Sequence, residues 1–269
     1  MIGAIAGDMI GSIYEGDPVK TKDFCLFAAD ADFTDDTVLT VAVAEVLLTG
    51  GDYTETFKRY FRRYPNRGFG ASFYHWARSA DPLPYGSFGN GAAMRVSPIG
   101  WAFDSLETVL EEAKRSAAVS HNHPEGIKGA QATAAAVFLA RSGAGKDEIK
   151  RYVESTFGYD LHRALEAIRP HYHFDVSCQG SVPEAILCFL EAEDYEDAVR
   201  NAVSLGGDSD TMACIAGGIA EAFYGGVPAP IQVEVWRRLD AELKATVQAF
   251  IQAYCSPGQA SRLCYPSQP

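Results

Sequence analysis

The 269-residue sequence lacks a long hydrophobic run. No apolar stretch approaches the roughly 18 residues of a transmembrane helix, so we expect no membrane association. Cysteine is also sparse, with six residues at scattered positions and no CxxC pair, which argues against a disulfide framework. We therefore predict reduced thiols and a cytoplasmic protein.

Basic residues are outnumbered. Lysine and arginine number 23 against 35 aspartates and glutamates, which gives a formal net charge of −12. Such a chain repels a phosphate backbone, so we expect no nucleic-acid binding through a basic face. A nucleotide ligand is still compatible with this charge, because a small local cradle of backbone N–H groups can hold a diphosphate.

Alternating hydrophobic and polar runs typical of β-strands are missing from the sequence, and its periodicity is helical almost throughout. No linker, low-complexity segment or repeat divides it. We therefore predict an all-α fold with a single domain over residues 1–269. The predicted helices cover residues 37–48, 105–118, 125–142, 147–157, 183–192, 195–205, 211–224 and, as one long helix, 230–254.

Two acidic loops stand out because each directly precedes an apolar helix. The first is FTDDT at residues 33–37, and the second is GGDSDT at residues 206–211. Helix capping is one interpretation, since Asp, Ser and Thr are preferred N-caps. Capping needs only one such side chain per helix, however, and four carboxylates packed together would repel one another unless a cation lay between them.

The side chains of these loops favour a hard cation. They are rich in oxygen and contain neither histidine nor cysteine, a set that suits Mg²⁺, Mn²⁺ or Ca²⁺ rather than zinc. Several carboxylates also permit two ions, an arrangement used to activate water in hydrolysis. Upstream, residues 7–15 add Asp8, which could tie a helix end, and Glu15, which could be a surface carboxylate or a general base beside the ions.

A glycine-rich loop at residues 86–95, GSFGNGAAMR, could direct consecutive backbone N–H groups at a phosphate. It is neither a Walker A loop nor a dinucleotide-binding GxGxxG, and an ordinary turn is the alternative. Phe88 within it could stack on an adenine or pack inward. The H-x-H pair of His121 and His123 could ligate a metal, although capping or hydrogen bonding is the more common use of such a pair.

Taken together, these segments resemble the ADP-ribosylglycohydrolase family. The resemblance implies an orthogonal helical bundle around a dinuclear Mg²⁺ or Mn²⁺ centre. The matching pieces follow the family's order and span most of the chain: they are GDMIGSIYE (7–15), TDDT (34–37), GSFGNGAAMR (86–95), SHNHPEG (120–126) and GGDSDT (206–211). The metal ligands that the resemblance implies are Thr34, Asp35, Asp36, Asp208, Asp210 and Thr211.

The same resemblance implies a substrate and a cleft to hold it. The substrate would be a protein ADP-ribosylated on arginine or serine, or a small ADP-ribosyl conjugate, and hydrolysis of its glycosidic bond would release ADP-ribose. Glu15 matches the family's glutamate near the metals, and Asp36 or Glu15 would take the proton of the attacking water. Phe88 would lie against adenine, His121 would lie in the ADP-ribose cleft, and the diphosphate would be cradled by Gly86, Ser87, Gly89, Asn90 and Gly91.

Two other interpretations stay open at this point. One is a non-catalytic ADP-ribose-binding or structural member of the family, which the intact ligand set disfavours. The other is a Mg²⁺-dependent phosphohydrolase that cuts a nucleotide diphosphate. We expect a monomer, and the sequence does not reveal the acceptor.

Overall fold

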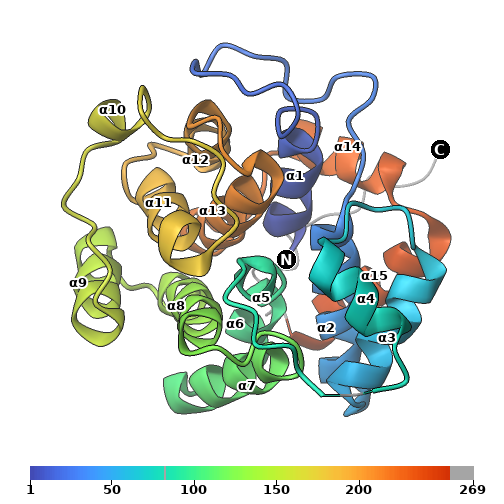
Figure 1. The fold of residues 1–269 in the computed structure, drawn as a ribbon. Helices are drawn as coiled ribbons and strands as arrows, with labels where there is room; N and C mark the ends of the chain where they lie inside the picture. The colour runs from blue at the N-terminus through green and yellow to red at the C-terminus, as the bar shows by residue number, and fades with distance from the viewer. Residues whose placement is uncertain (82, 255–269) are drawn as a thin grey trace.

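The computed structural model describes residues 1–81 and 83–254, which fold into helices and their connections (Figure 1). Within this part of the chain there is no strand, only an isolated antiparallel bridge between Gly89 and Ser177. The predicted all-α class is confirmed. The helices are α1 (Ile2–Gly11), α2 (Asp35–Thr49), α3 (Tyr53–Arg63), α4 (Ala71–Arg78), α5 (Gly91–Met94), α6 (Ser97–Ala102), α7 (Leu106–Ala118), α8 (Pro124–Arg141), α9 (Lys146–Phe157), α10 (Leu165–Ile168), α11 (Cys178–Leu190), α12 (Tyr195–Ser204), α13 (Ser209–Tyr224), α14 (Ala229–Arg238) and α15 (Ala241–Tyr254).

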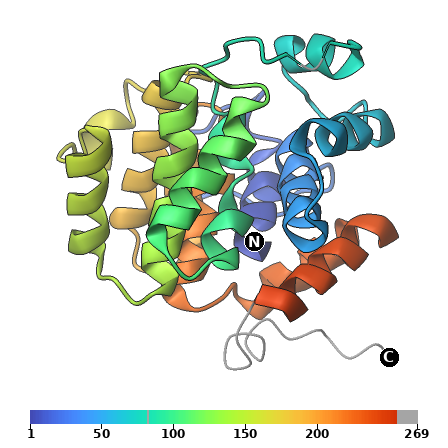
Figure 2. The same ribbon diagram turned by 90° about the horizontal axis from the view of Figure 1, so that it is seen from below.

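Helix α13 is the central element and is buried along almost its whole length. It packs against α1, α8, α11 and α12, whereas α2 packs against α3, α6 and α15. The view from below shows α8, α11 and α12 on one side of the molecule and α2, α3 and α15 on the other (Figure 2). Helix α1 contacts both α13 and α2, so it joins the two groups of helices.

Helices α1 and α13 approach closely because α1 presents glycines to its partner. Gly3, Gly7 and Gly11 are spaced one helical turn apart and share one face of α1. A Cβ atom on any of them would overlap the backbone of α13, which at Gly7 means the carbonyl group of Ala213. Only hydrogen fits there, and this close approach brings the C-terminal half of α1 against the first turn of α13.

The predicted single helix over residues 230–254 is wrong. The structure divides it into α14 and α15, which are separated at Leu239, whose backbone is extended with ψ of 142°. The Asp240 carboxylate accepts the backbone N–H groups of Glu242 and Leu243, so it caps the new helix. The apolar periodicity continues across the break, which is why the sequence alone suggested one helix.

Other helix boundaries also differ from the prediction. Helix α11 begins at Cys178, before the predicted start at residue 183, and carries Pro183 inside it. The Ser177 hydroxyl accepts the N–H of Gly180 and caps this earlier start. Helices α1, α3 to α6 and α10 have no counterpart among the predicted ones.

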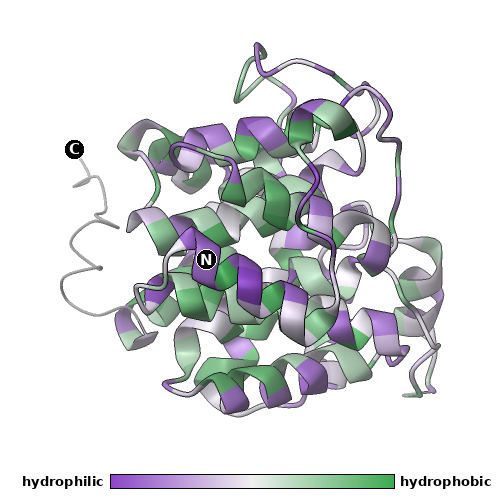
Figure 3. Cartoon of the chain, turned by 90° about the vertical axis from the view of Figure 1, so that its left-hand side faces the viewer, coloured by the Kyte–Doolittle hydropathy of each residue, from purple (hydrophilic) through white to green (hydrophobic). Residues whose placement is uncertain are grey.

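Many of the helices carry hydrophilic residues on one face and hydrophobic residues on another (Figure 3). Helix α3, for example, buries Phe57 and Phe61 while Arg62 and Arg63 are exposed. None of the described helices is long and apolar enough to cross a membrane. The cysteines in the described part of the chain are free thiols, and the other two, Cys255 and Cys264, lie outside the described residues.

Candidate metal centre and ligand cleft

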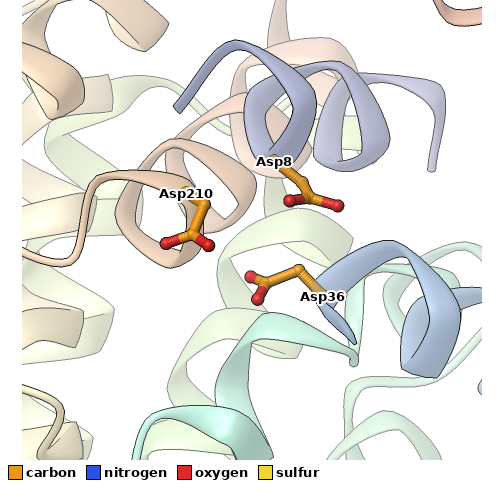
Figure 4. A group of neighbouring side chains, drawn as sticks. All are labelled: Asp8, Asp36 and Asp210. Atoms are coloured by element: carbon orange, nitrogen blue, oxygen red, sulfur yellow. The ribbon is translucent and has the colours of Figure 1, made fainter. Parts of the chain in front are cut away.

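The two acidic loops meet in space. Asp36 in the first turn of α2 and Asp210 in the first turn of α13 point toward one another, and Asp8 of α1 completes the group (Figure 4). One carboxylate oxygen from each of these three residues lies within 4.8 Å of the others. The Thr211 hydroxyl donates a 3.2 Å hydrogen bond to Asp36 and links the two helix starts directly.

A second acidic group lies beside the first. It consists of Glu15, Asp208 and Asp210, whose carboxylate oxygens also lie within 4.8 Å of one another. Asp210 belongs to both groups, so the two sets of carboxylates are adjacent. Glu15 is exposed, whereas the aspartates are buried.

Burial and mutual repulsion make these carboxylates hard to ionise without a cation. Burial, followed by the neighbouring carboxylates, raises the pKa of Asp35, Asp36 and Asp210 well above the ordinary value. Burial and the charges of Asp208 and Asp8 also raise the pKa of Glu15. The Oδ1 atom of Asp36 is buried without a hydrogen-bond partner among the described residues. An orphaned acceptor among oxygen ligands fits a hard divalent ion.

Asp8 is the ligand candidate absent from the predicted metal set. The backbone N–H and hydroxyl groups of both Thr34 and Thr37 donate to its carboxylate. The suggestion that Asp8 ties a helix end is therefore confirmed, since these bonds fix the start of α2. They also oppose the effect of burial, which raises the pKa of Asp8 to about 6. No signal in the sequence around Asp8 indicates that its carboxylate reaches the start of α2.

Thr34 and Asp35 are the remaining predicted ligands from the first loop. Thr34 is the N-cap of α2, and its hydroxyl accepts the backbone N–H of Asp36. Asp35 is outside both acidic groups but lines the same cleft. Its backbone N–H donates to the carbonyl oxygen of Arg67 at 2.6 Å, and a Cβ built at Gly68 would lie 3.3 Å from its carboxylate. Asp35 therefore faces the loop that leads into α4.

The acidic groups open into a cleft of about 410 Å³, within the usual size of a small-molecule site. Two of the residues predicted to bind ADP-ribose, Gly86 and Phe88, do not line this cleft. Phe88 is 49% exposed, with its ring 5.4 Å from that of His123, and the Gly86 N–H donates to Asn122. The predicted residues that do line it are Glu15, Thr34, Asp35, Asp36, Ser87, Gly89, Asn90, Gly91, His121, Asp208, Asp210 and Thr211.

Asn90 has a contact that the sequence did not reveal. Its side-chain amide donates to Asp208 at 2.7 Å and to Ser181 at 3.2 Å, so it orients an acidic residue. Its backbone N–H donates to the carbonyl oxygen of Val176, and Cys178 N–H donates to the carbonyl oxygen of Phe88. The glycine-rich loop is thus fastened to the segment that precedes α11.

Several cleft residues were missed by the sequence analysis. The loop into α4 contributes Gly68 and Gly70, and the first turn of α4 follows it into the cleft with no side-chain cap on its N–H groups. The signal was the RGFGAS run at residues 67–72, a glycine pair ahead of a helix. Others missed are Leu39, Phe73, Tyr85, Met94, Phe174 and Val176.

Comparisons with known proteins point to one family. ADP-ribosylhydrolase ARH3 of Danio rerio is 28% identical over 96% of this chain and 90% of its own length, and ARH3 of Mus musculus is 27% identical over 88% and 85%. ADP-ribosylarginine hydrolase Tri1 of Pseudomonas putida is 25% identical over 84% and 69%. A solved ADP-ribosylglycohydrolase-related protein complex superimposes with a TM-score of 0.70 at 26% identity, covering 94% of this chain and 96% of that one. The family model for ADP-ribosylglycohydrolase matches residues 1–259, and the chain belongs to that family, as its motifs predicted.

Proposed function

We propose that the protein is a metal-dependent hydrolase that cleaves the glycosidic bond between ADP-ribose and an acceptor. The observation that carries the proposal is the meeting of two acidic groups, from α1, α2, α13 and the Glu15 segment, at the end of a ligand-sized cleft. Family membership and relatives named as ADP-ribosylhydrolase and ADP-ribosylarginine hydrolase support this reaction class. We take the acceptor to be an arginine or serine side chain or a small conjugate.

Two Mg²⁺ or Mn²⁺ ions are the cofactors that suit the donor set. Thr34, Asp35 and Asp36 would hold them from the α2 side, and Asp208, Asp210 and Thr211 from the α13 side. Asp8 adds a carboxylate beside Asp36. When bound, such ions polarise an attacking water and orient the ribose hydroxyls.

The remainder of the cleft suits the rest of ADP-ribose. The first turn of α4, which has no side-chain cap, supplies backbone N–H groups for a diphosphate. In the loop at residues 86–91 the N–H groups of Gly86, Gly89 and Asn90 already donate to acceptors within the protein, so any diphosphate contact of this loop would use its other groups. His121 lies on the wall beside that loop. The exposed side chains of Phe174 and Val176 give an apolar rim for the adenine, with Phe88 on the adjoining segment.

The proton of the attacking water would pass to Asp36 or Glu15. Glu15 is the more accessible of the two, since it is exposed whereas Asp36 is buried. The carboxylates around the ribose would also stabilise positive charge that develops on it as the acceptor leaves.

The test is incubation with arginine-linked and serine-linked ADP-ribosyl peptides, with Mg²⁺ or Mn²⁺ and with EDTA, read by mass spectrometry. The proposal expects intact ADP-ribose and free peptide, only when metal is present. Release of AMP would identify a phosphohydrolase instead. ADP-ribose binding without turnover under any of these conditions would identify a non-catalytic binding protein.

We further propose that the protein works as a cytoplasmic monomer. Sedimentation with and without ADP-ribose tests this, and a stable dimer would contradict it.

A further inference from the structure

Behind the wall of the cleft lies a buried arginine that the proposed chemistry does not use. Arg95 follows α5 and has no solvent exposure. Its guanidinium lies 4.4 Å from the ring centre of Phe57, and it has no ion-pair partner among the described residues. A buried charge without an ion-pair partner is costly, so its hydrogen bonds must offset the loss of solvation.

Those hydrogen bonds lead to the cleft. The Nη2 atom of Arg95 donates to the carbonyl oxygen of Ser116 at 2.6 Å and to the hydroxyl of Ser120 at 3.2 Å. The hydroxyl oxygen of Ser120 lies 2.8 Å from Nδ1 of His121. Arg95, Ser120 and His121 therefore form one chain of contacts that ends at a residue of the cleft wall.

The chemistry of the arginine fixes the direction of this chain. Every polar hydrogen-bonding atom of a guanidinium is a donor, so the Ser120 oxygen must accept from Arg95. Ser120 is fully buried, and its hydroxyl hydrogen has only His121 Nδ1 as an acceptor among the contacts of this oxygen. If Nδ1 carried a proton instead, the hydroxyl hydrogen would be buried without a partner. Burial, together with the nearby Arg95 charge, lowers the pKa of His121 well below its ordinary value, so the ring is neutral.

The other ring nitrogen faces the glycine-rich loop. Cβ atoms built at Gly91 and Gly89 would lie 3.1 Å and 3.6 Å from Nε2 of His121. Glycine at these positions leaves Nε2 uncovered on the cleft side, and no described residue accepts a hydrogen bond from it.

We propose that Arg95 and Ser120 are positioning residues that hold His121 as the Nε2–H tautomer, so that this N–H is a fixed donor to a ligand oxygen beside the glycine-rich loop. The tautomer follows from the protein alone. The identity of the oxygen, a phosphate or ribose oxygen of ADP-ribose, rests on the proposed function.

The test compares Ser120→Ala with Ser116→Ala in full-length protein labelled with ¹⁵N-histidine. Ser120→Ala breaks the chain at its middle, whereas Ser116→Ala removes only the side-chain acceptor of Arg95 Nε and leaves the chain intact. His121→Gln assigns the ring signals. Without ligand, we expect wild type and Ser116→Ala to give the shifts of an unprotonated Nδ1 and a protonated Nε2, and Ser120→Ala to give a mixture of tautomers.

Calorimetry with ADP-ribose supplies the second measurement. We expect about tenfold weaker binding for Ser120→Ala, the loss of one well-directed hydrogen bond, and little change for Ser116→Ala. A protonated Nδ1 in wild type, or unchanged ring shifts in Ser120→Ala, would overturn the proposal. If no variant and no wild-type protein binds ADP-ribose, the proposed function fails, while the nitrogen shifts still decide the tautomer.

Discussion

Among the carboxylates of the candidate metal centre, Asp36 has the hydrogen bonding that best fits a metal ligand. One of its carboxylate oxygens accepts from Thr211, and the other is buried without a partner among the described residues. We expect Asp36→Asn to fold, because the amide has the same shape and removes charge repulsion, but to lose turnover by about 100-fold or more. Initial rates of ADP-ribose release measure this.

The matched control is Asp17→Asn, which removes an exposed carboxylate elsewhere in the acidic N-terminal segment. It should leave turnover within a factor of about two, since an exposed surface charge contributes little. Full activity in Asp36→Asn would remove this residue from the mechanism.

Asn90 acts on the candidate metal centre through Asp208. Its amide donates to that carboxylate and thereby sets the direction of a candidate ligand. We expect Asn90→Ala to lower metal affinity by about 10–100-fold, as is typical when a group that orients a ligand is lost. Titration of activity with Mg²⁺ gives the affinity. Ser181→Ala removes only the other acceptor of Asn90 and should leave it nearly unchanged, and equal metal affinity in all three proteins would contradict the role.

At the scale of elements, the glycine face of α1 decides whether the acidic residues can meet. We expect Gly7→Ala to destabilise the protein by about 1–3 kcal/mol, because the added methyl group overlaps the backbone of α13 and forces the helices apart. Metal binding should weaken as well, since Asp8 moves with α1. Urea unfolding gives the stability change.

Gly16→Ala serves as the control for this substitution. Nothing lies within 4 Å of a Cβ built at Gly16, so the free energy of unfolding should change little. If Gly7→Ala were as stable as wild type, the close approach of α1 and α13 would be incorrect.

The elements that the sequence predicted are those with a strong apolar stripe or an apolar run between clear caps. Helix α7 begins after Ser105, whose hydroxyl accepts a backbone N–H, and α2 ends at Gly50 in the left-handed conformation. Helix α1 was missed because glycine has low helix propensity, and its value here lies in tertiary packing. The break at Leu239 was missed because the apolar pattern continues across it, while the Asp240 side chain caps a new helix at this point.

At the scale of the whole molecule, repulsion among buried carboxylates sets how stability depends on pH. A carboxyl whose pKa is raised in the folded protein stabilises the fold below its ordinary pKa, and that contribution is lost as pH rises through the raised value. For Asp8 this value is about 6, and for Asp36 and Asp210 the shift has the same direction. In EDTA we therefore expect a lower Tm at about pH 8 than at about pH 5, measured by scanning calorimetry.

Excess Mg²⁺ should raise the Tm at about pH 8, because an ion that binds only the folded state stabilises it. Asp210→Asn removes the carboxylate shared by both acidic groups and should show a smaller fall with pH and a smaller response to Mg²⁺. An equal or higher Tm at the higher pH in EDTA would contradict the repulsion.

Much of the candidate site was predictable because its pieces are local sequence motifs. The TDDT and GGDSDT segments each indicate a helix start, and each has more carboxylates than capping needs. The structure brings the two segments together as expected. Asp8 was underrated because nothing in its neighbourhood tells which helix start it reaches. The run at residues 67–72 was overlooked because its place beside Asp35 depends on the packing of α2 and α4 through α3.

One residue, Asn90, connects the glycine-rich loop to the candidate metal centre. Asn90 lies in the loop beside which an anion would bind, and its side-chain amide donates to a carboxylate that would bind a cation. We expect an ion held by Asp208 to fix the Asn90 side chain and so to strengthen anion binding at the loop, and thermodynamic linkage then requires a bound anion to strengthen ion binding by the same factor. Substrate would then bind most tightly to protein that already holds its ions, and the protein would lose those ions more readily after the product has dissociated.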